Sequence, residues 1–463
     1  MKDILKKYNV FFVGIMLFLM SGCDKYLDVL PPSTSVNPTT IKDFEEMLNT
    51  DSLALPQFFL LDLISDDVQF RDYQLNNVSN YFSRSYLWER SIWNSADLDL
   101  MYSSAYSRIL QMNIILSRVD EAPKDETNTD ERKANVISKA LIHRAWYYLQ
   151  LVNAYGRVYD PVTASSDLGV PLILRPDANS LPSRATIQEV YDQILGDLKQ
   201  AVANSYLPAK GKNILHPGKA AGYALLARAS LLQSRYDQAE KYADTVLSLV
   251  NTIQDYNVSY TGLTQLEELA LNPEILLGKI TVEKDFYREM GGVFRSGKSL
   301  NDSLGSADLR NARRFTYRSY NVTGSGTATT IAFDNSVGTP EVYLIKAECL
   351  ARAGKVTEAG TILDNLRKNR IPQASLRNRS YSAGNILAYV LGERRRELFY
   401  KGGLRLFDIK RLNKEGLVTI NLKRQNENYT EDLATLEAGS PRFIMPFAPI
   451  IIANNPNIIQ NDR

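Results

Sequence analysis

Two stretches of the sequence share one spacing of bulky and small residues, and this spacing constrains the fold more than any other feature. In the stretch at about 219–250, the repeated positions are Tyr223, Leu226, Ala227, Ala239 and Ala243. In the stretch at about 342–370, they are Tyr343, Ala347, Leu350, Ala359 and Leu363. Small residues where two helices cross are typical of the tetratricopeptide repeat, whose units become stable by stacking. Unrelated amphipathic hairpins are the alternative, but the aligned small residues favour a repeat.

Looser helix pairs flank these two units, because apolar residues recur at helical spacing before and after them. Thr186 and Glu189 stand three positions apart before an apolar run, which is the capping box of a helix N-terminus. The sequence therefore predicts a mainly α chain with four tetratricopeptide-like hairpins in one domain over 41–463. The hairpins are expected at about 99–155 with 186–204, 219–250, 342–370 and 383–412.

The N-terminus has the pattern of an export signal. Three lysines precede the apolar run Val10–Met20, and two small residues and Cys23 follow it. The run is shorter than the roughly 20 residues that cross a bilayer. Small residues directly before a cysteine fit the lipobox of bacterial lipoproteins, whose thiol is acylated and whose chain is cut before it. We therefore expect a signal at 1–22 and a lipid on Cys23, with a tether over 23–40. An ordinary cleaved signal with an incidental cysteine is the alternative.

Charge and composition exclude several classes of site. The formal net charge of +2 gives no basis for nucleic-acid binding, which favours a concentrated basic surface. Only 2 cysteines occur, so no disulfide framework is expected, and Cys349 is interpreted as a buried small hydrophobe. His143 and His216 are the only histidines, which excludes a multi-histidine metal site within one chain, and neither has a Ser or Cys partner at motif spacing. The sequence predicts no cofactor and no metal-ligand set.

Aromatic residues gather in two segments that lack a helical period. The chain has 26 Tyr, 16 Phe and 3 Trp, and such a surplus of tyrosine suits a stacking surface. Gln69–Trp93 is expected to be a long loop-rich excursion of the kind that often carries function. Between the two repeat units, about 256–339, a strand is expected at Ile275–Val282, and aromatic residues stand among Gly and Ser. We expect this segment to be an insertion mounted on the helical frame.

Several short segments occur in the order known from one family. They are Cys23 with Tyr26-Leu27-Asp28 and Pro31, Tyr147-Tyr148-Leu149 to Tyr155-Gly156-Arg157-Val158, Asp308-Leu309-Arg310, Tyr343-Leu344-Ile345-Lys346-Ala347-Glu348, Glu393-Arg394-Arg395-Arg396-Glu397-Leu398, Gly402-Gly403-Leu404-Arg405-Leu406-Phe407-Asp408-Ile409-Lys410-Arg411, and Asn455-Pro456-Asn457 to Gln460-Asn461. Together they resemble the SusD-like (RagB/SusD) lipoproteins of Bacteroidetes over nearly the whole mature chain. One departure lies near the end, where Ala448 and Ile451 replace the family's usual Pro and Glu.

The resemblance implies a fold and a role. The implied SusD-like fold is a helical frame of four tetratricopeptide-like hairpins with an irregular, loop-rich face and a few short strands. The implied role is non-catalytic: such lipoproteins are anchored in the outer membrane, at the cell surface, as lids on a TonB-dependent transporter of the SusC type. They capture an oligosaccharide, or in some members a peptide, and pass it to the transporter.

Sugars present flat C–H faces, so aromatic rings stack on them while amides and charged groups bond their hydroxyls. The excursion offers this mixture, and the insertion is expected to supply a facing wall. The predicted ligand-binding residues are Asp67, Tyr73, Trp88, Trp93 and Asn94 in or beside the excursion, and Tyr287, Tyr317 and Tyr320 in the insertion. For each aromatic residue alone, burial in the frame is the alternative.

The charged run Glu393–Arg396 has two interpretations. It suits an anion site, but adjacent positions on a helix point in different directions, so we expect Arg394 or Arg395 to pair with acids of neighbouring helices.

Two rival functions remain open from the sequence. A surface glycosidase needs only a pair of carboxylates about 5–10 Å apart, which sequence alone does not exclude. Helical repeats and the lack of a nucleophile or metal motif speak against it. The other rival is a scaffold that binds only proteins.

Overall fold

The computed structural model describes residues 38–124, 129–177, 179–258, 269–291, 294–311, 316–321 and 327–463. For Tyr287 and residues 316–321 and 327–330, the description is of the backbone. All the elements named here lie in Thr40–Arg463, the second of the two units into which the chain divides.

Helices dominate this second unit, and the prediction of a mainly α chain is confirmed. The α-helices are α2 (Ile41–Leu48), α3 (Phe59–Ile64), α4 (Asp72–Asn77), α5 (Tyr81–Tyr86), α6 (Leu100–Arg118), α7 (Thr129–Tyr155), α8 (Ile187–Ala203), α9 (Lys219–Leu232), α10 (Tyr236–Leu249), α12 (Phe286–Met290), α13 (Lys298–Leu304), α14 (Thr339–Arg352), α15 (Val356–Lys368), α16 (Ile386–Leu398), α17 (Leu404–Glu415) and α18 (Pro449–Asn454). The short 3-10 helices are η2 (Asp51–Ala54), η3 (Val119–Glu121) and η5 (Pro441–Phe443).

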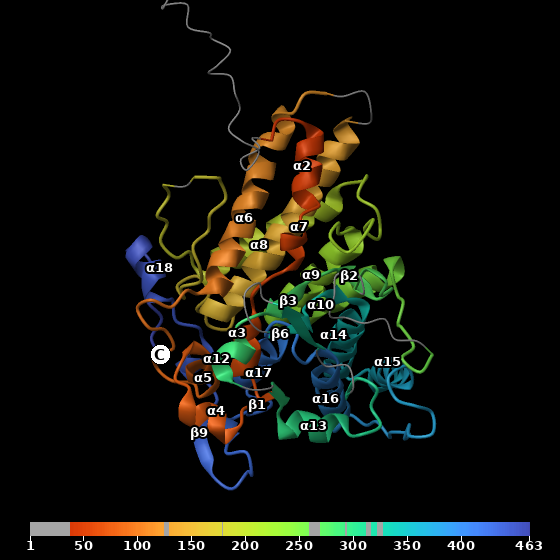
Figure 1. Cartoon of the computed structure of the whole chain (residues 1–463). Coiled ribbons are helices and arrows are strands. Elements are labelled where there is room, and N and C mark those ends of the chain that lie inside the picture. The colour runs from red at the N-terminus through yellow and green to blue at the C-terminus, as the bar shows by residue number, and fades with distance from the viewer. Residues whose placement is uncertain are drawn as a thin grey trace, which may run out of the picture. The chain divides into compact units, whose positions relative to one another are not determined.

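The long helices pack against their neighbours in sequence (Figure 1). α6 packs on α7 and α7 on α8, α9 packs on α10, and α14 packs on α15 and α16, while contacts between α10 and α14 join successive pairs. In the two predicted repeat units the small residues are buried at 0% exposure, namely Ala227, Ala239 and Ala243 in one, and Ala347 and Ala359 in the other. Small side chains therefore let the paired helices approach each other, as the repeated spacing predicts.

The described strands form four small antiparallel sheets. The strands are β1 (Val68–Gln69), β2 (Ile275–Leu277), β3 (Ile280–Glu283), β4 (Arg295–Ser296), β5 (Thr316–Asn321), β6 (Thr327–Asp334), β7 (Val337–Gly338), β8 (Leu422–Gln425) and β9 (Asp432–Leu436). Their order is β3-β6-β5 in one sheet, and β1-β4, β2-β7 and β8-β9 in the others. Val68 pairs with Ser296 and Gln69 with Arg295, so the excursion and the insertion share a sheet.

The excursion is more regular than the sequence predicts, because it contains the helices α4 and α5. Asn80 caps α5 by accepting hydrogen bonds from the backbone N–H groups of Phe82 and Ser83. Phe82 and Tyr86 of that helix are buried in the core. Helices this short are held by capping and tertiary packing rather than by a repeated apolar period. A further short helix, α18, lies near the end of the chain.

Aromatic rings fasten the insertion to the frame. The Phe286 ring of α12 lies 5.3 Å from that of Phe59 and 5.4 Å from that of Phe82, between centroids. Phe59 in turn stacks on Phe333 of β6, with 5.4 Å between centroids and 15° between planes. Because these rings come from α3, α5, α12 and β6, one cluster joins the frame, the excursion and the insertion.

No helix within the described ranges is long and apolar enough to cross a membrane. Nor do three or more His, Cys, Asp or Glu side chains of those ranges gather so that they hold a metal ion.

Candidate functional site

The excursion and the insertion lie side by side. The hydroxyl of Tyr73 in α4 donates a 2.7 Å hydrogen bond to the carbonyl oxygen of Gly291, 218 positions later in the sequence. The amide of Gln74 donates to the carbonyl oxygen of Met290 at 3.4 Å. Figure 1 shows α4, α5 and α12 in the same region of the molecule. The structure therefore brings together the two segments that the sequence singles out for ligand binding.

Tyr73 and Asn94 are accessible. Tyr73 is 40% exposed, and the Arg71 guanidinium lies 6.0 Å from the centroid of its ring. The hydrogen bond to Gly291 fixes the far end of this side chain. Asn94 is exposed, and its backbone N–H donates to the Asp97 carboxylate at 2.7 Å. A ring held at the surface by its own hydroxyl offers a fixed face for a ligand.

Trp93 lies at the edge of a cavity of about 450 Å³. It is 6% exposed, and its indole N–H donates to the carbonyl oxygen of Pro446 at 2.8 Å. Its ring lies 5.7 Å from that of Tyr81, at 30° between planes. Arg90, Phe447 and Gln460 are among the other lining residues. Only an edge of the indole is therefore available to a molecule in this cavity.

Asp67 and Trp88 require a correction. Both are 0% exposed. The Trp88 indole N–H donates to the carbonyl oxygen of Ile64 at 2.8 Å, and the Arg424 guanidinium lies 4.3 Å from its ring. Asp67 pairs with Arg395 at 2.9 Å. Because α5 and the turn after it carry Trp88 into the core, neither side chain presents a surface to a ligand, and both serve packing and ion pairing in this structure.

The side chains of Tyr287, Tyr317 and Tyr320 lie outside the description. Their backbones belong to α12 and β5, within the insertion. Their assignment to the ligand face stays a prediction.

One candidate surface was not predicted from the sequence. The loop between β8 and β9 carries Tyr429, which is 39% exposed and lines a cavity of about 340 Å³ together with Asp66 and Arg395. The sequence feature that could have indicated this surface is the polar run Asn426–Asp432. It stands between two segments in which apolar and polar residues alternate, a pattern that is typical of a hairpin.

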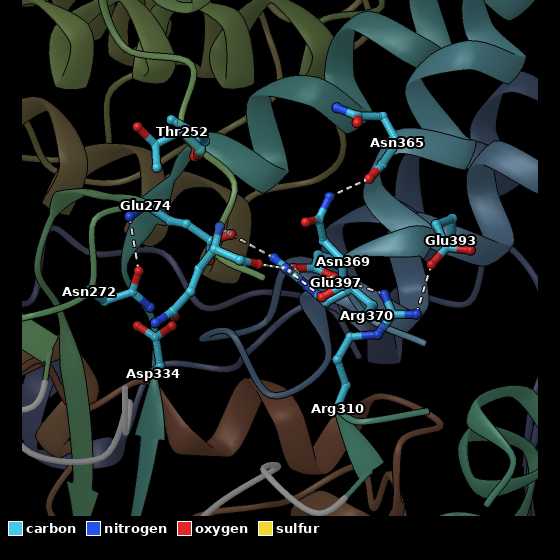
Figure 2. A network of polar contacts seen from close by, with 12 residues as sticks. Thr252, Asn272, Glu274, Arg310, Asp334, Asn365, Asn369, Arg370, Glu393 and Glu397 are labelled. Atoms are coloured by element: carbon cyan, nitrogen blue, oxygen red, sulfur yellow. Dashed lines mark hydrogen bonds and ion pairs between the residues drawn. The ribbon is translucent and has the colours of Figure 1, made fainter. Parts of the chain in front are cut away.

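A buried ion network connects α16 with the segments after α15 and before β2 (Figure 2). Arg370 pairs with Glu274 at 2.8 Å and with Glu397 at 2.9 Å. Arg310, from the Asp308-Leu309-Arg310 segment, pairs with Glu393 at 2.7 Å and with Glu397 at 2.8 Å. Burial alone raises the pKa of Glu393, but Arg310 and Arg396 outweigh it and lower that pKa to about 2. The Glu393 carboxylate therefore stays charged and helps to hold the segments together.

The charged run in α16 is structural, as predicted. Arg394 donates to the carboxylate of Asp408 in α17 at 2.8 Å. Arg395 pairs with Asp67 at 2.9 Å and with Asp66 at 3.1 Å. Each arginine joins α16 to a different segment, which confirms the pairing with neighbouring acids.

Comparison with known families decides the assignment. Residues 25–231 match a SusD-like family model described as starch-binding and associating with the outer membrane. Residues 314–463 match the model of the SusD family. The chain belongs to the SusD-like family. No curated protein matches the sequence.

Solved structures share the fold of this SusD-like chain. A SusD superfamily protein from Bacteroides thetaiotaomicron VPI-5482 has a TM-score of 0.70 at 19% identity, over 92% of this chain and 100% of that chain. A SusD superfamily protein from Bacteroides fragilis has a TM-score of 0.68 at 20% identity, over 91% and 99%. A SusD-like carbohydrate binding protein from Bacteroides vulgatus ATCC 8482 has a TM-score of 0.65 at 17% identity, over 91% and 98%. These similarities concern the fold, and they confirm the SusD-like fold that the sequence predicts.

Proposed function

We propose that this SusD-like chain is a non-catalytic, cell-surface lipoprotein that captures an oligosaccharide and passes it to a SusC-like TonB-dependent transporter of the outer membrane. Membership of the family supports the class of protein. One observation carries the ligand class: Tyr73 presents a partly exposed ring at the junction of excursion and insertion, with the cation of Arg71 beside it.

The geometry of Tyr73 suits a sugar. The C–H face of a pyranose packs on an aromatic ring, and its hydroxyls need donors and acceptors nearby. Because the Tyr73 hydroxyl already bonds to Gly291, the ring loses little freedom when a ligand binds. In this proposal Asn94 and the edge of Trp93 extend the surface, and Tyr287, Tyr317 and Tyr320 form the facing wall.

Calorimetric titration with oligosaccharides from starch, xylan, pectin and galactomannan tests the ligand class. We expect at least one series to bind, and Tyr73→Ala to weaken its affinity about five-fold, since a stacked ring contributes about 1 kcal/mol. Tyr206→Ala is the matched control, because Tyr206 is 54% exposed in the segment between α8 and α9. Equal affinity of the Tyr73 variant and the parent contradicts the placement of the site. Binding of peptides alone favours the peptide-binding alternative.

Two further measurements test the remaining parts of the proposal. Prolonged incubation with the same oligosaccharides should release no product, and any product supports the glycosidase rival. Pull-down of the full chain from solubilised outer membranes should recover a TonB-dependent transporter. Recovery of no such protein contradicts the proposed partner.

A further inference from the structure

The loop between β8 and β9 places a tyrosine in an unfavourable backbone conformation. Tyr429 has a φ of +60°, which is the left-handed region that glycine and asparagine adopt most readily. The loop is closed by Asn426, whose side-chain oxygen accepts from the N–H groups of Thr430 at 2.8 Å and Glu431 at 3.2 Å. The N–H of Tyr429 donates to the carbonyl oxygen of Asn426 at 3.0 Å. The loop therefore holds the position of Tyr429 firmly, although a large side chain there is locally disfavoured.

Burial does not explain why a tyrosine occupies this position. Trp88 and Tyr400 also have positive φ, but both are buried at 1% exposure or less, so their rings stabilise the core. Tyr429 is 39% exposed. A strained residue whose ring faces solvent is a candidate for function, since packing gives no reason for it.

The Tyr429 ring borders a polar cavity of about 340 Å³. One wall is rigid: Asp66 accepts two hydrogen bonds from Arg405, at 2.8 and 2.9 Å, and pairs with Arg395 at 3.1 Å. Lys298 and Lys423 also line it.

The two lysines are free to turn toward a ligand. Lys298 pairs with Asp302, and Lys423 with Asp432, but all four side chains are at least 42% exposed. Exposed pairs of this kind contribute little to stability. Their ammonium groups can therefore move to ligand hydroxyls at a small cost in free energy. An aromatic face beside fixed carboxylate and guanidinium groups and two movable donors matches the chemistry of a pyranose ring.

The loop lies next to the helix that carries Tyr73. The backbone N–H of Glu427 donates to the carboxylate of Asp72, the first residue of α4, at 2.8 Å. The Glu427 carboxylate also pairs with Arg295 of β4 at 3.3 Å. Tyr429 and Tyr73 therefore belong to neighbouring segments.

We propose that Tyr429 and the cavity beneath it form a second sugar-binding subsite, which holds a further pyranose ring of an oligosaccharide bound at Tyr73. The inference rests on the proposed function, since it takes the ligand to be an oligosaccharide. It adds that the chain selects extended glycans, because only a long chain of sugars fills both subsites.

Tyr429→Gly separates a binding role from a structural one. Glycine adopts the observed φ without strain, so the melting temperature of this variant should equal or exceed that of the parent. Its affinity for long oligosaccharides should fall about five-fold, the factor expected for one stacked ring. Its affinity for disaccharides should stay at the parent's value. A merely structural Tyr429 predicts the opposite, namely a lower melting temperature and unchanged affinity.

The experiment uses native electrophoresis through gels that contain soluble starch, xylan, pectin or galactomannan, together with thermal unfolding. Parent, Tyr429→Gly and the control Tyr206→Ala run side by side. We expect the polysaccharide that retards the parent and the control to retard Tyr429→Gly less. Equal retardation of all three proteins overturns the subsite and leaves the proposed function standing. No retardation of the parent by any of the four polysaccharides contradicts the proposed function and the subsite with it.

Discussion

At the scale of single residues, the buried pair of Lys279 and His143 is sensitive to protons. The Lys279 ammonium lies 4.7 Å from the ring centroids of Trp146 and Tyr147 and donates to the carbonyl oxygen of Leu53 and to Nδ1 of His143, the latter at 3.2 Å. Nε2 of His143 lies 2.9 Å from the carbonyl oxygen of Leu215 and so carries the ring proton. A second proton on His143 would remove the acceptor that Lys279 uses. Burial and the charge of Lys279 hold the pKa of His143 well below its ordinary value of 6.5.

The protein should therefore lose stability in mild acid. The unfolded chain binds more protons than the folded chain below pH 6.5, so this contribution is fully present above pH 6.5 and is lost as the pH falls. Burial likewise lowers the pKa of His216 to about 4, which adds to the effect. Urea unfolding between pH 7 and pH 5 measures how the free energy of unfolding changes with pH. His143→Gln should reduce the slope of the free energy of unfolding against pH by up to about 1.4 kcal/mol per pH unit, which is the limit for one proton. A variant slope equal to that of the parent would refute the role of His143.

At the scale of elements, the ion network of Figure 2 joins the end of α15, the helix α16 and the residue before β2. Arg370 is 0% exposed and also donates to the carbonyl oxygen of Gln254 at 2.7 Å. Glu274 and Glu397 depend on it for charge compensation. Buried carboxylates that lose their partner are strongly destabilising.

Arg370→Ala should lower the free energy of unfolding by about 3–5 kcal/mol. Chemical denaturation measures this change. Lys355→Ala is the matched control, because Lys355 pairs with Glu240 at the surface and its removal should leave the denaturation midpoint almost unchanged. Similar midpoints for the two variants would show that the network does not hold these elements together.

Elements with long apolar periods were predictable from the sequence, and elements held by tertiary contacts were not. The repeated spacing in α9–α10 and α14–α15 identifies both pairs, because their small residues occupy the helix crossings. The helices α4 and α5 and the β8–β9 hairpin are too short for a period to identify them.

The candidate site was likewise predictable only in part from the sequence. The sequence locates its two segments, but it does not separate the exposed Tyr73 from the buried Trp88, because burial depends on contacts with distant residues such as Arg424.

At the scale of the whole molecule, the proposed function requires attachment to a membrane. Cys23 lies outside the described residues, and its lipidation stays a prediction from the Ser21-Gly22-Cys23 pattern. Cys23→Ala removes the acylated thiol, so cell fractionation should move the protein from the outer-membrane fraction to soluble or trapped pools. Protease treatment of intact cells should then no longer remove it. A variant that stays in the outer membrane like the parent would contradict the lipid anchor.

The pairing of β1 with β4 also orders events during biogenesis. Val68 can pair with Ser296 only after synthesis has passed residue 296. Under the proposed function, a chain that ends before Ser296 therefore lacks the junction of excursion and insertion at which Tyr73 would meet a sugar. On that proposal, products truncated before the insertion would be inert toward sugars rather than partly active competitors.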